Sequence, residues 1–118
     1  MATKPIAKLR EAALGLPEAE EGVSGNKACF RAGKKNFLFI GDYGDSWDVM
    51  LKLGDSIGEA EKLSKEDPDR YGIGRAGWVS ANFAAGDGPP SGLFERWIEE
   101  SYRLIVPKRL VSLLPEPE

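Results

Sequence analysis

Three glycines stand at the spacing of a phosphate-binding loop in the stretch YGIGRAGWV, residues 71–79. Gly72, Gly74 and Gly77 match G-x-G-x-x-G, and the valine that follows completes the longer form found in kinases. Such a loop needs a buried strand before it and a helix N-terminus after it to hold phosphate. Here the preceding SKEDPDRY is polar and contains Pro68, while WVSANF alternates like a strand. We therefore interpret the glycines as a flexible turn leading into an edge or hairpin strand.

The chain contains no histidine, and this absence removes several classes of catalytic chemistry. Ser-His-Asp and Cys-His arrangements are impossible, and the usual zinc site lacks its imidazole. Asp42, Asp45 and Asp48 miss the spacing of a calcium loop, and we expect the first two to cap turns. Adjacent Glu20 and Glu21 would point to opposite faces of a strand, which is poor geometry for an acid–base pair. We expect no enzymatic activity, no metal and no cofactor.

The composition is that of an ordinary globular domain. The chain has 118 residues, 42% of them hydrophobic and 30% charged, and a net charge of −3. We expect one domain, residues 1–118, with a core over about 5–114 and a tail at 115–118. The N-terminal stretch lacks the uninterrupted apolar region of a signal peptide, no apolar run approaches a membrane span, and the single Cys29 fits a reducing compartment. We therefore expect a cytoplasmic protein that makes no membrane contact.

The pattern of apolar residues predicts both helices and strands. Apolar residues at helical spacing predict a first helix over 6–16, capped by Thr3 and ended by Pro17. A second helix over 55–67 would be capped by Asp55 or Ser56. A third would be capped by Ser91, and Pro107 would either kink it or begin a final short helix. Alternation predicts five strands, at 20–24, 27–32, 36–41, 45–53 and 77–83. For the third helix we expect an inner face of Phe94, Trp97, Ile98, Ser101, Leu104 and Ile105.

Together these elements predict the fold class. Helices and hairpin-linked strands in one short chain are typical of an α+β fold. We expect a single domain in which an antiparallel β-sheet carries its helices packed on one face.

Several segments in order along the chain resemble the MmcQ/YjbR family. ACFRAGKKNFLFI places Phe30, Gly33, Lys34 and Phe37 at the family's F-x-x-x-G-K-x-F positions. It follows an LREAALGLPEAEEG segment, and GRAGWVSANF and FERWIEESYRLIVPKRLVSLL come later in the family's order. The resemblance implies a domain of the CyaY-like or secretion-chaperone-like type. It also implies DNA as a partner, by likeness to a "double-wing" β-sheet that contacts DNA.

Alternation along the strands predicts which residues the sheet leaves uncovered. If Val79, Ala81 and Phe83 face the helices, their neighbours face the other way. The same reasoning applied to the other strands directs Phe30 inward and Cys29 outward. The uncovered face would then show Arg31, Met50, Lys52, Trp78, Ser80 and Asn82. An exposed indole beside cations could stack on bases or another planar ligand. Alternatively, a loop or a second subunit covers Trp78.

Cations are concentrated in one part of the sequence. Residues 27–35 contain Lys27, Arg31, Lys34 and Lys35 and no carboxylate, and Lys108 and Arg109 form a second cluster. A hairpin tip with two lysines could contact phosphate. Charged hairpin tips also protect sheet edges and maintain solubility, so both interpretations stay open.

The leading hypothesis is a non-enzymatic binding domain whose partner is nucleic acid. The candidate binding residues are Arg31, Lys34, Lys35, Lys52, Arg75 and Trp78. A second hypothesis is a protein-interaction adaptor or small homodimer that buries Trp78 and Met50. A third is a small-molecule binding protein in which the uncovered face forms one wall of a pocket.

Overall fold

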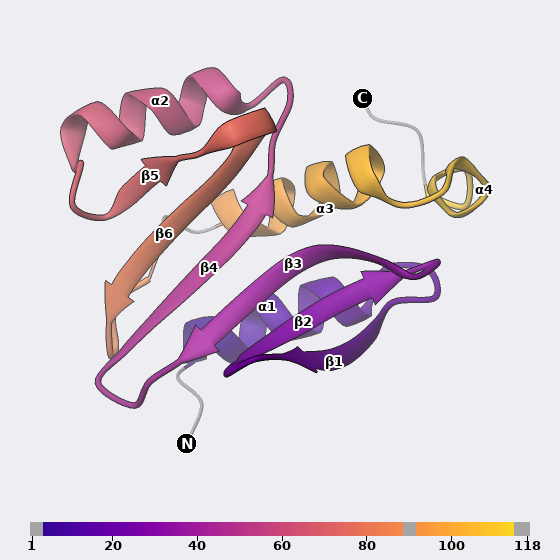
Figure 1. Cartoon of the computed structure of the whole chain (residues 1–118), viewed down its shortest axis with the longest axis horizontal. Helices are drawn as coiled ribbons and strands as arrows, with labels where there is room; N and C mark the ends of the chain where they lie inside the picture. Colours follow the sequence, from indigo (N-terminus) through magenta and orange to yellow (C-terminus); the bar gives the residue numbers. More distant parts are fainter. Residues whose placement is uncertain (1–3, 89–91, 115–118) are drawn as a thin grey trace.

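A computed structural model describes residues 4–88 and 92–114 of the chain (Figure 1). Within these ranges six strands form one antiparallel sheet in the order β1-β2-β3-β4-β6-β5. The first four strands follow the chain as a meander, and β6 then pairs with β4. The strands are β1 Glu20–Ser24, β2 Lys27–Ala32, β3 Lys35–Asp42, β4 Ser46–Lys52, β5 Tyr71–Ile73 and β6 Trp78–Ala84.

The helices lie on one side of this sheet. Figure 1 shows α1 and α3 behind the strands and α2 along the edge formed by β5, so the face toward the viewer is uncovered by any described helix. We call this uncovered side the open face. The predicted α+β class, with helices on one face of an antiparallel sheet, is confirmed. The helices are α1 Lys4–Leu14, α2 Ile57–Glu66, α3 Leu93–Ile105, α4 Lys108–Val111 and the short 3-10 helix η1 Arg75–Gly77.

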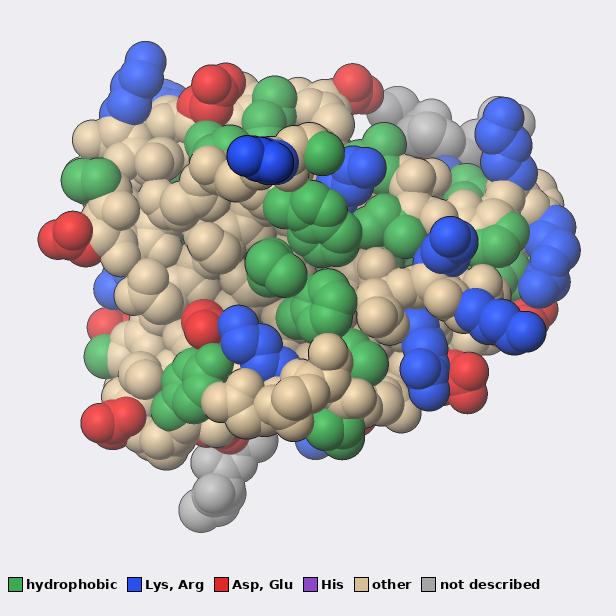
Figure 2. Space-filling model, viewed as in Figure 1, with side chains coloured by type: hydrophobic (Ala, Val, Ile, Leu, Met, Phe, Trp, Pro, Cys, Tyr) green, Lys and Arg blue, Asp and Glu red, His purple; other side chains and the backbone are tan. Residues whose placement is uncertain are grey.

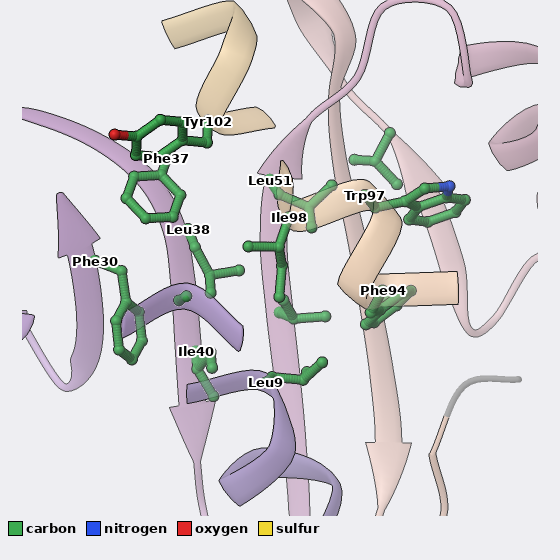
Figure 3. Packing of buried hydrophobic residues seen from close by; sticks show 14 of the residues in the cluster. Leu9, Phe30, Phe37, Leu38, Ile40, Leu51, Phe94, Trp97, Ile98 and Tyr102 are labelled. Carbon is green, nitrogen blue, oxygen red and sulfur yellow. The ribbon is translucent and has the colours of Figure 1, made fainter. Parts of the chain in front are cut away.

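The core fills the space between the sheet and the helices. Alternate residues of β4 and β6 are buried, as the period-two pattern predicted. Figure 3 shows side chains of α1 and α3, such as Leu9 and Ile98, in the same layer as Ile40 and Leu51 of the strands. Toward α3, the Trp47 and Phe83 rings stack with centroids 4.6 Å apart. Every described strand except β1 contributes buried residues to this cluster.

A bulge in β3 directs two consecutive residues into the core. Phe30 pairs with Leu38 and Arg31 with Asn36, so Phe37 has no partner on β2. Phe37 and Leu38 are consequently both fully buried. The buried Ser101 hydroxyl of α3 donates to the Phe37 carbonyl at 2.6 Å and accepts from the Lys52 backbone N–H at 3.0 Å. A helix side chain thus satisfies the backbone groups where β3 and β4 separate.

The glycine-rich stretch is a hairpin, and it contains a strand that the sequence pattern did not predict. β5 is only three residues long and its centre is Gly72, so it lacks both length and a β-branched run. It forms because its backbone pairs with β6 at the sheet edge. The predicted turn into a hairpin strand corresponds to η1, whose C-terminal Gly77 has φ +85°.

Helix caps differ from those predicted. Ser56 occupies the N-cap position of α2, but its side chain makes no capping hydrogen bond. Glu100 of α3 instead anchors the loop that leads into α2: its carboxylate accepts from the backbone N–H groups of Gly54 (2.8 Å) and Ser56 (3.0 Å) and from the Ser56 hydroxyl (2.6 Å). Asp55 does not supply the cap. The predicted caps Thr3 and Ser91, and the tail 115–118, lie outside the described residues.

Two predictions about the C-terminal helices are resolved. Pro107 begins a final helix, α4, instead of kinking α3. Leu104 was predicted to be buried but is 48% exposed, because it lies beyond the angular range of α3 that contacts the sheet.

A carboxylate connects α2 to α3 and gives stability a dependence on pH. The Trp97 indole N–H donates to Glu59 at 2.9 Å, and Arg96 lies 3.3 Å from the same carboxylate. The Trp97 hydrogen bond, helped by Arg96, holds the pKa of Glu59 below its usual 4.5. The folded state therefore prefers ionised Glu59. This contribution is complete above the unfolded-state pKa and is lost as pH falls through the folded-state pKa.

We expect Glu59→Gln to reduce stability by less than about 1 kcal/mol at neutral pH, because the side chain is 41% exposed and screened by water. The difference from the wild type should shrink as the pH falls below 4.5. Urea unfolding from pH 7 to pH 3 measures it. Glu61→Gln is the matched control on α2, since Glu61 makes no ion pair with any described residue. A Glu59→Gln deficit that grows at low pH would contradict the assignment.

Candidate functional site

The centre of the open face is an apolar surface. Cross-strand register aligns Cys29, Phe39, Met50 and Ser80 in one row across β2, β3, β4 and β6. Trp78 lies two residues from Ser80 on β6, and its ring centroid is 6.1 Å from that of Phe39. We call Phe39, Met50 and Trp78 the aromatic patch; all three are partly exposed. Figure 2 shows hydrophobic side chains gathered at the middle of this face.

Trp78 differs from the other two tryptophans in its exposure. Trp47 and Trp97 are 0% and 1% exposed and belong to the core, whereas Trp78 is only partly buried. Trp78 is half-buried, so the described residues already cover much of its surface and leave the remainder open. One of its contacts is with Phe39, from a strand two places away. The indole is therefore available as part of a flat surface.

The five predicted cations lie at the same end of the sheet, where β2 and β4 end and β3 and β6 begin. Lys52 ends β4 and stands opposite Trp78, which begins β6. Arg75 lies in η1, and the Leu53 backbone N–H donates to Gly77 at 2.9 Å, which fixes that loop to the end of β4. Arg31 comes from the end of β2. The structure therefore places these residues, far apart in sequence, at a common end of the sheet.

The β2–β3 turn brings the predicted hairpin lysines to the same end. Gly33 and Lys34 both have positive φ, +57° and +68°, as in a two-residue hairpin turn. A Cβ on Gly33 would lie 2.8 Å from the Pro107 ring, so the turn packs directly on the start of α4. The second predicted cluster thereby joins the first. We call the combined set the basic end: Arg31, Lys34, Lys35, Lys52, Arg75, Lys108 and Arg109.

Most of the basic end is not neutralised by the protein itself. In the ranges that the structure describes, Arg109 pairs with Glu18 at 3.3 Å, but the five predicted cations make no ion pair. Glu20 stands opposite Arg31 in the β1–β2 register without pairing with it. Figure 2 shows Lys and Arg side chains around the central patch, many on the right, where Figure 1 places the β2–β3 turn and α4.

The Arg31 side chain lies close to the sheet surface because Gly22, on the adjacent strand β1, has no side chain. A Cβ on Gly22 would lie 3.3 Å from a guanidinium nitrogen of Arg31 and 3.4 Å from the Cys29 sulfur. The guanidinium therefore lies over β1 beside Cys29. Cys29 was predicted to face outward, and it does, but it is only 2% exposed. Its neighbours cover it, so it is no accessible thiol.

The opposite end of the sheet carries Asp42, Asp45 and Asp48, of which Asp48 pairs with a lysine. Asp48 lies 3.5 Å from the Lys27 ammonium and accepts from the Tyr43 hydroxyl at 3.1 Å. Asp42 accepts from the Gly44 N–H at 3.1 Å, which confirms its predicted role in a turn. Charge is thus unevenly distributed along the strands: Asp42, Asp45 and Asp48 lie at one end, and most of the unpaired cations lie at the other.

Sequence reasoning missed one member of the site, Phe39. Leu38 and Ile40 on either side are buried, so alternation alone would have directed Phe39 to the open face. The predicted residues Ser80 and Asn82 are exposed as expected. Asn82 donates to the carbonyls of Asp69 and Arg70 at 3.0 and 3.3 Å, so it anchors the chain before β5 and is not free for a ligand.

Other kinds of site receive less support. No group of three or more metal-ligating side chains occurs within 4–88 and 92–114. A cavity of about 180 Å³ lies on the helix side, and its lining includes Arg10 and Glu21, which form an ion pair at 2.7 Å. It is smaller than the roughly 300 Å³ of a typical ligand site. Over the same ranges, no helix is long and apolar enough to cross a membrane.

Comparison with known families places the chain. The YjbR family model matches residues 14–104, from the end of α1 to the end of α3. The chain belongs to the YjbR family. That match includes every strand and all of the candidate residues predicted from the sequence. A search of curated proteins finds no significant match.

A solved structure agrees with this assignment. The crystal structure of Deinococcus radiodurans protein DR2400, with a domain of family DUF419, superposes with a TM-score of 0.66. The alignment covers 84% of this chain and 76% of that one at 21% sequence identity. At that identity the similarity shows a shared fold and nothing about the ligand. The site must therefore be interpreted from this YjbR chain's own residues.

Proposed function

We propose that this YjbR protein is a non-enzymatic cytoplasmic protein that binds nucleic acid through the open face of its sheet. The observation that supports this most directly is the basic end, where five predicted cations have no ion-pair partner among the described residues. Unpaired lysines and arginines beside a flat surface are suited to contact phosphates, which supply most of the affinity in nucleic-acid binding.

The net charge of −3 is compatible with this proposal because charge is unevenly distributed. Asp48 lies at the far end of the sheet and pairs there with Lys27. Glu59, Glu99 and Glu100 lie on the helices, away from the open face. A polyanion approaching the basic end would therefore meet a local positive field.

The test is a fluorescence-anisotropy titration with labelled 20-nucleotide DNA at several salt concentrations. We expect binding at low salt, with an affinity that falls steeply as salt rises, since each phosphate contact contributes roughly 0.7–0.9 to the slope of log K against log salt. Binding with no salt dependence, or no binding even at low salt, would overturn the proposal.

Charge reversal locates the contacts. We expect Lys34→Glu/Lys35→Glu to weaken binding by about 10-fold or more and to reduce the salt slope by about 1.5. The matched control is Lys62→Glu/Lys65→Glu, which makes the same change in net charge on the exposed surface of α2. Equal losses for the two double variants would show that net charge alone, and not the basic end, determines affinity.

A further inference from the structure

We propose that the open face selects single-stranded over double-stranded nucleic acid, because unpaired bases stack on the aromatic patch. This inference rests on the proposed function above and specifies its ligand. The supporting features are the partial exposure of Trp78, Phe39 and Met50, the arrangement of these three residues across three strands, and the cations at the same end of the sheet.

The aromatic patch has the shape that a base face requires. The Phe39 and Trp78 rings come from β3 and β6, and Met50 of β4 lies between these strands. At both sheet edges the same row ends in glycine, Gly22 on β1 and Gly72 on β5, so neither edge residue contributes a side chain of its own, and the Arg31 guanidinium lies over Gly22. The result is a broad, flat apolar surface that remains partly open to solvent.

Such a surface can contact bases only when they are unstacked. In a duplex the base faces are covered by neighbouring pairs, and only the base edges are reached, through the grooves. The open face has no described helix or protruding β-ribbon that could enter a groove (Figure 1). In a single strand each base offers a π-face to an aromatic side chain, whatever its sequence.

The cations are positioned to hold the backbone of a strand whose bases are stacked. Lys52 stands directly opposite Trp78 in the β4–β6 register, and both are on the open face. Arg75 lies three residues before Trp78, in the loop fixed to the end of β4. A strand with a base on Trp78 would therefore have its phosphates beside Lys52 and Arg75. This complementarity of charge and stacking favours nucleic acid over a purely apolar partner.

The experiment compares labelled 12-nucleotide oligo-dT with a 12-base-pair duplex, using wild type, Trp78→Ala, Phe39→Ala and Trp78→Phe. We expect the single strand to bind at least 10-fold more tightly than the duplex. Trp78→Ala should weaken single-strand binding by roughly 5- to 150-fold, the range for one base stacked on an aromatic ring. It should leave the salt slope unchanged, and Trp78→Phe should restore much of the loss.

Tryptophan fluorescence provides a second readout that does not depend on affinity. Because Trp47 and Trp97 are buried, quenching by oligo-dT should come from Trp78 and be absent in Trp78→Phe. Thermal unfolding of each variant shows that the comparison is between folded proteins.

The outcomes separate this inference from the proposed function. If neither the single strand nor the duplex binds, both the proposed function and the single-strand inference are overturned. If both bind equally with a steep salt slope and Trp78→Ala has no effect, nucleic-acid binding stands and the single-strand inference is overturned. If size-exclusion chromatography shows a dimer that Trp78→Ala dissociates, the aromatic patch is a self-association surface and the inference is likewise overturned.

Discussion

Gly77→Ala is expected to destabilise the protein by at least about 3 kcal/mol, although the substitution adds one methyl group. Gly77 has φ +85°, and a Cβ there would lie far inside van der Waals contact with the Leu53 carbonyl oxygen. The clash is with backbone, which cannot rotate away, and the left-handed conformation adds its own strain. The same residue accepts the Leu53 N–H hydrogen bond. The glycines at this spacing therefore serve close backbone packing and not phosphate binding.

Two control glycines separate these contributions. Gly86 has φ +89° with nothing within 4 Å, so Gly86→Ala should cost only the conformational strain of about 1–2 kcal/mol. Gly58 is in α2 with open space around it, and Gly58→Ala should stabilise by about 0.5 kcal/mol. Urea unfolding followed by circular dichroism measures all three. If Gly77→Ala lowers the free energy of unfolding no more than Gly86→Ala does, the predicted clash with the Leu53 carbonyl is contradicted.

Gly77→Ala should also weaken DNA binding, because it distorts the loop that positions candidate binding residues. The loop that contains Gly77 also carries Arg75 and leads into Trp78. A variant that remains folded at low temperature should show Arg75 and Trp78 displaced from Lys52. We therefore expect any residual folded Gly77→Ala protein to bind DNA more weakly than Gly86→Ala protein.

Ser101→Ala is expected to cost about 2–4 kcal/mol, far more than a typical serine-to-alanine change in a helix. Its hydroxyl is fully buried, donates to the Phe37 carbonyl and accepts from the Lys52 N–H. Alanine would leave both backbone groups unpaired and buried, and each such group costs about 1–3 kcal/mol. Denaturant unfolding monitored by tryptophan fluorescence measures the difference.

The matched control is Ser112→Ala. That hydroxyl also donates to a backbone carbonyl, that of Arg109 at 2.8 Å, but the residue is exposed and water can replace the bond. We expect a change below about 0.5 kcal/mol. A similarly small effect for Ser101→Ala would contradict this assignment. It would mean that water or a backbone shift supplies hydrogen bonds to the Phe37 carbonyl and the Lys52 N–H when the hydroxyl is absent.

The face that each strand residue occupies could be predicted from the sequence because side-chain alternation is a local property of the backbone. Val79, Ala81 and Phe83 are buried, and Trp78, Ser80 and Asn82 point the other way, as the period of two requires. The apolar stripe of α3 was similarly evident, except at Leu104. The fold class followed from these patterns together with the family resemblance.

Elements that depend on distant partners could not be predicted. β5 is a strand only because β6 pairs with it, and three residues centred on glycine have no strand signal of their own. Glu100 anchors the loop before α2 from 44 residues away, and Ser101 joins backbone groups 49 and 64 residues away. A serine and a glutamate in a helix resemble ordinary helix residues until the tertiary structure places those groups beside them.

Some features of the candidate site could likewise be predicted from the sequence, and others could not. Alternation was enough to predict which residue types face outward: cations, an indole and small polar groups along alternating strands. Strand pairing and packing place Lys52 opposite Trp78, Phe39 beside that indole, and the β2–β3 turn against α4. Alternation is predictable because it is set by each residue's own backbone. Convergence into one basic end instead depends on strand order and register, which arise from packing across the whole sheet.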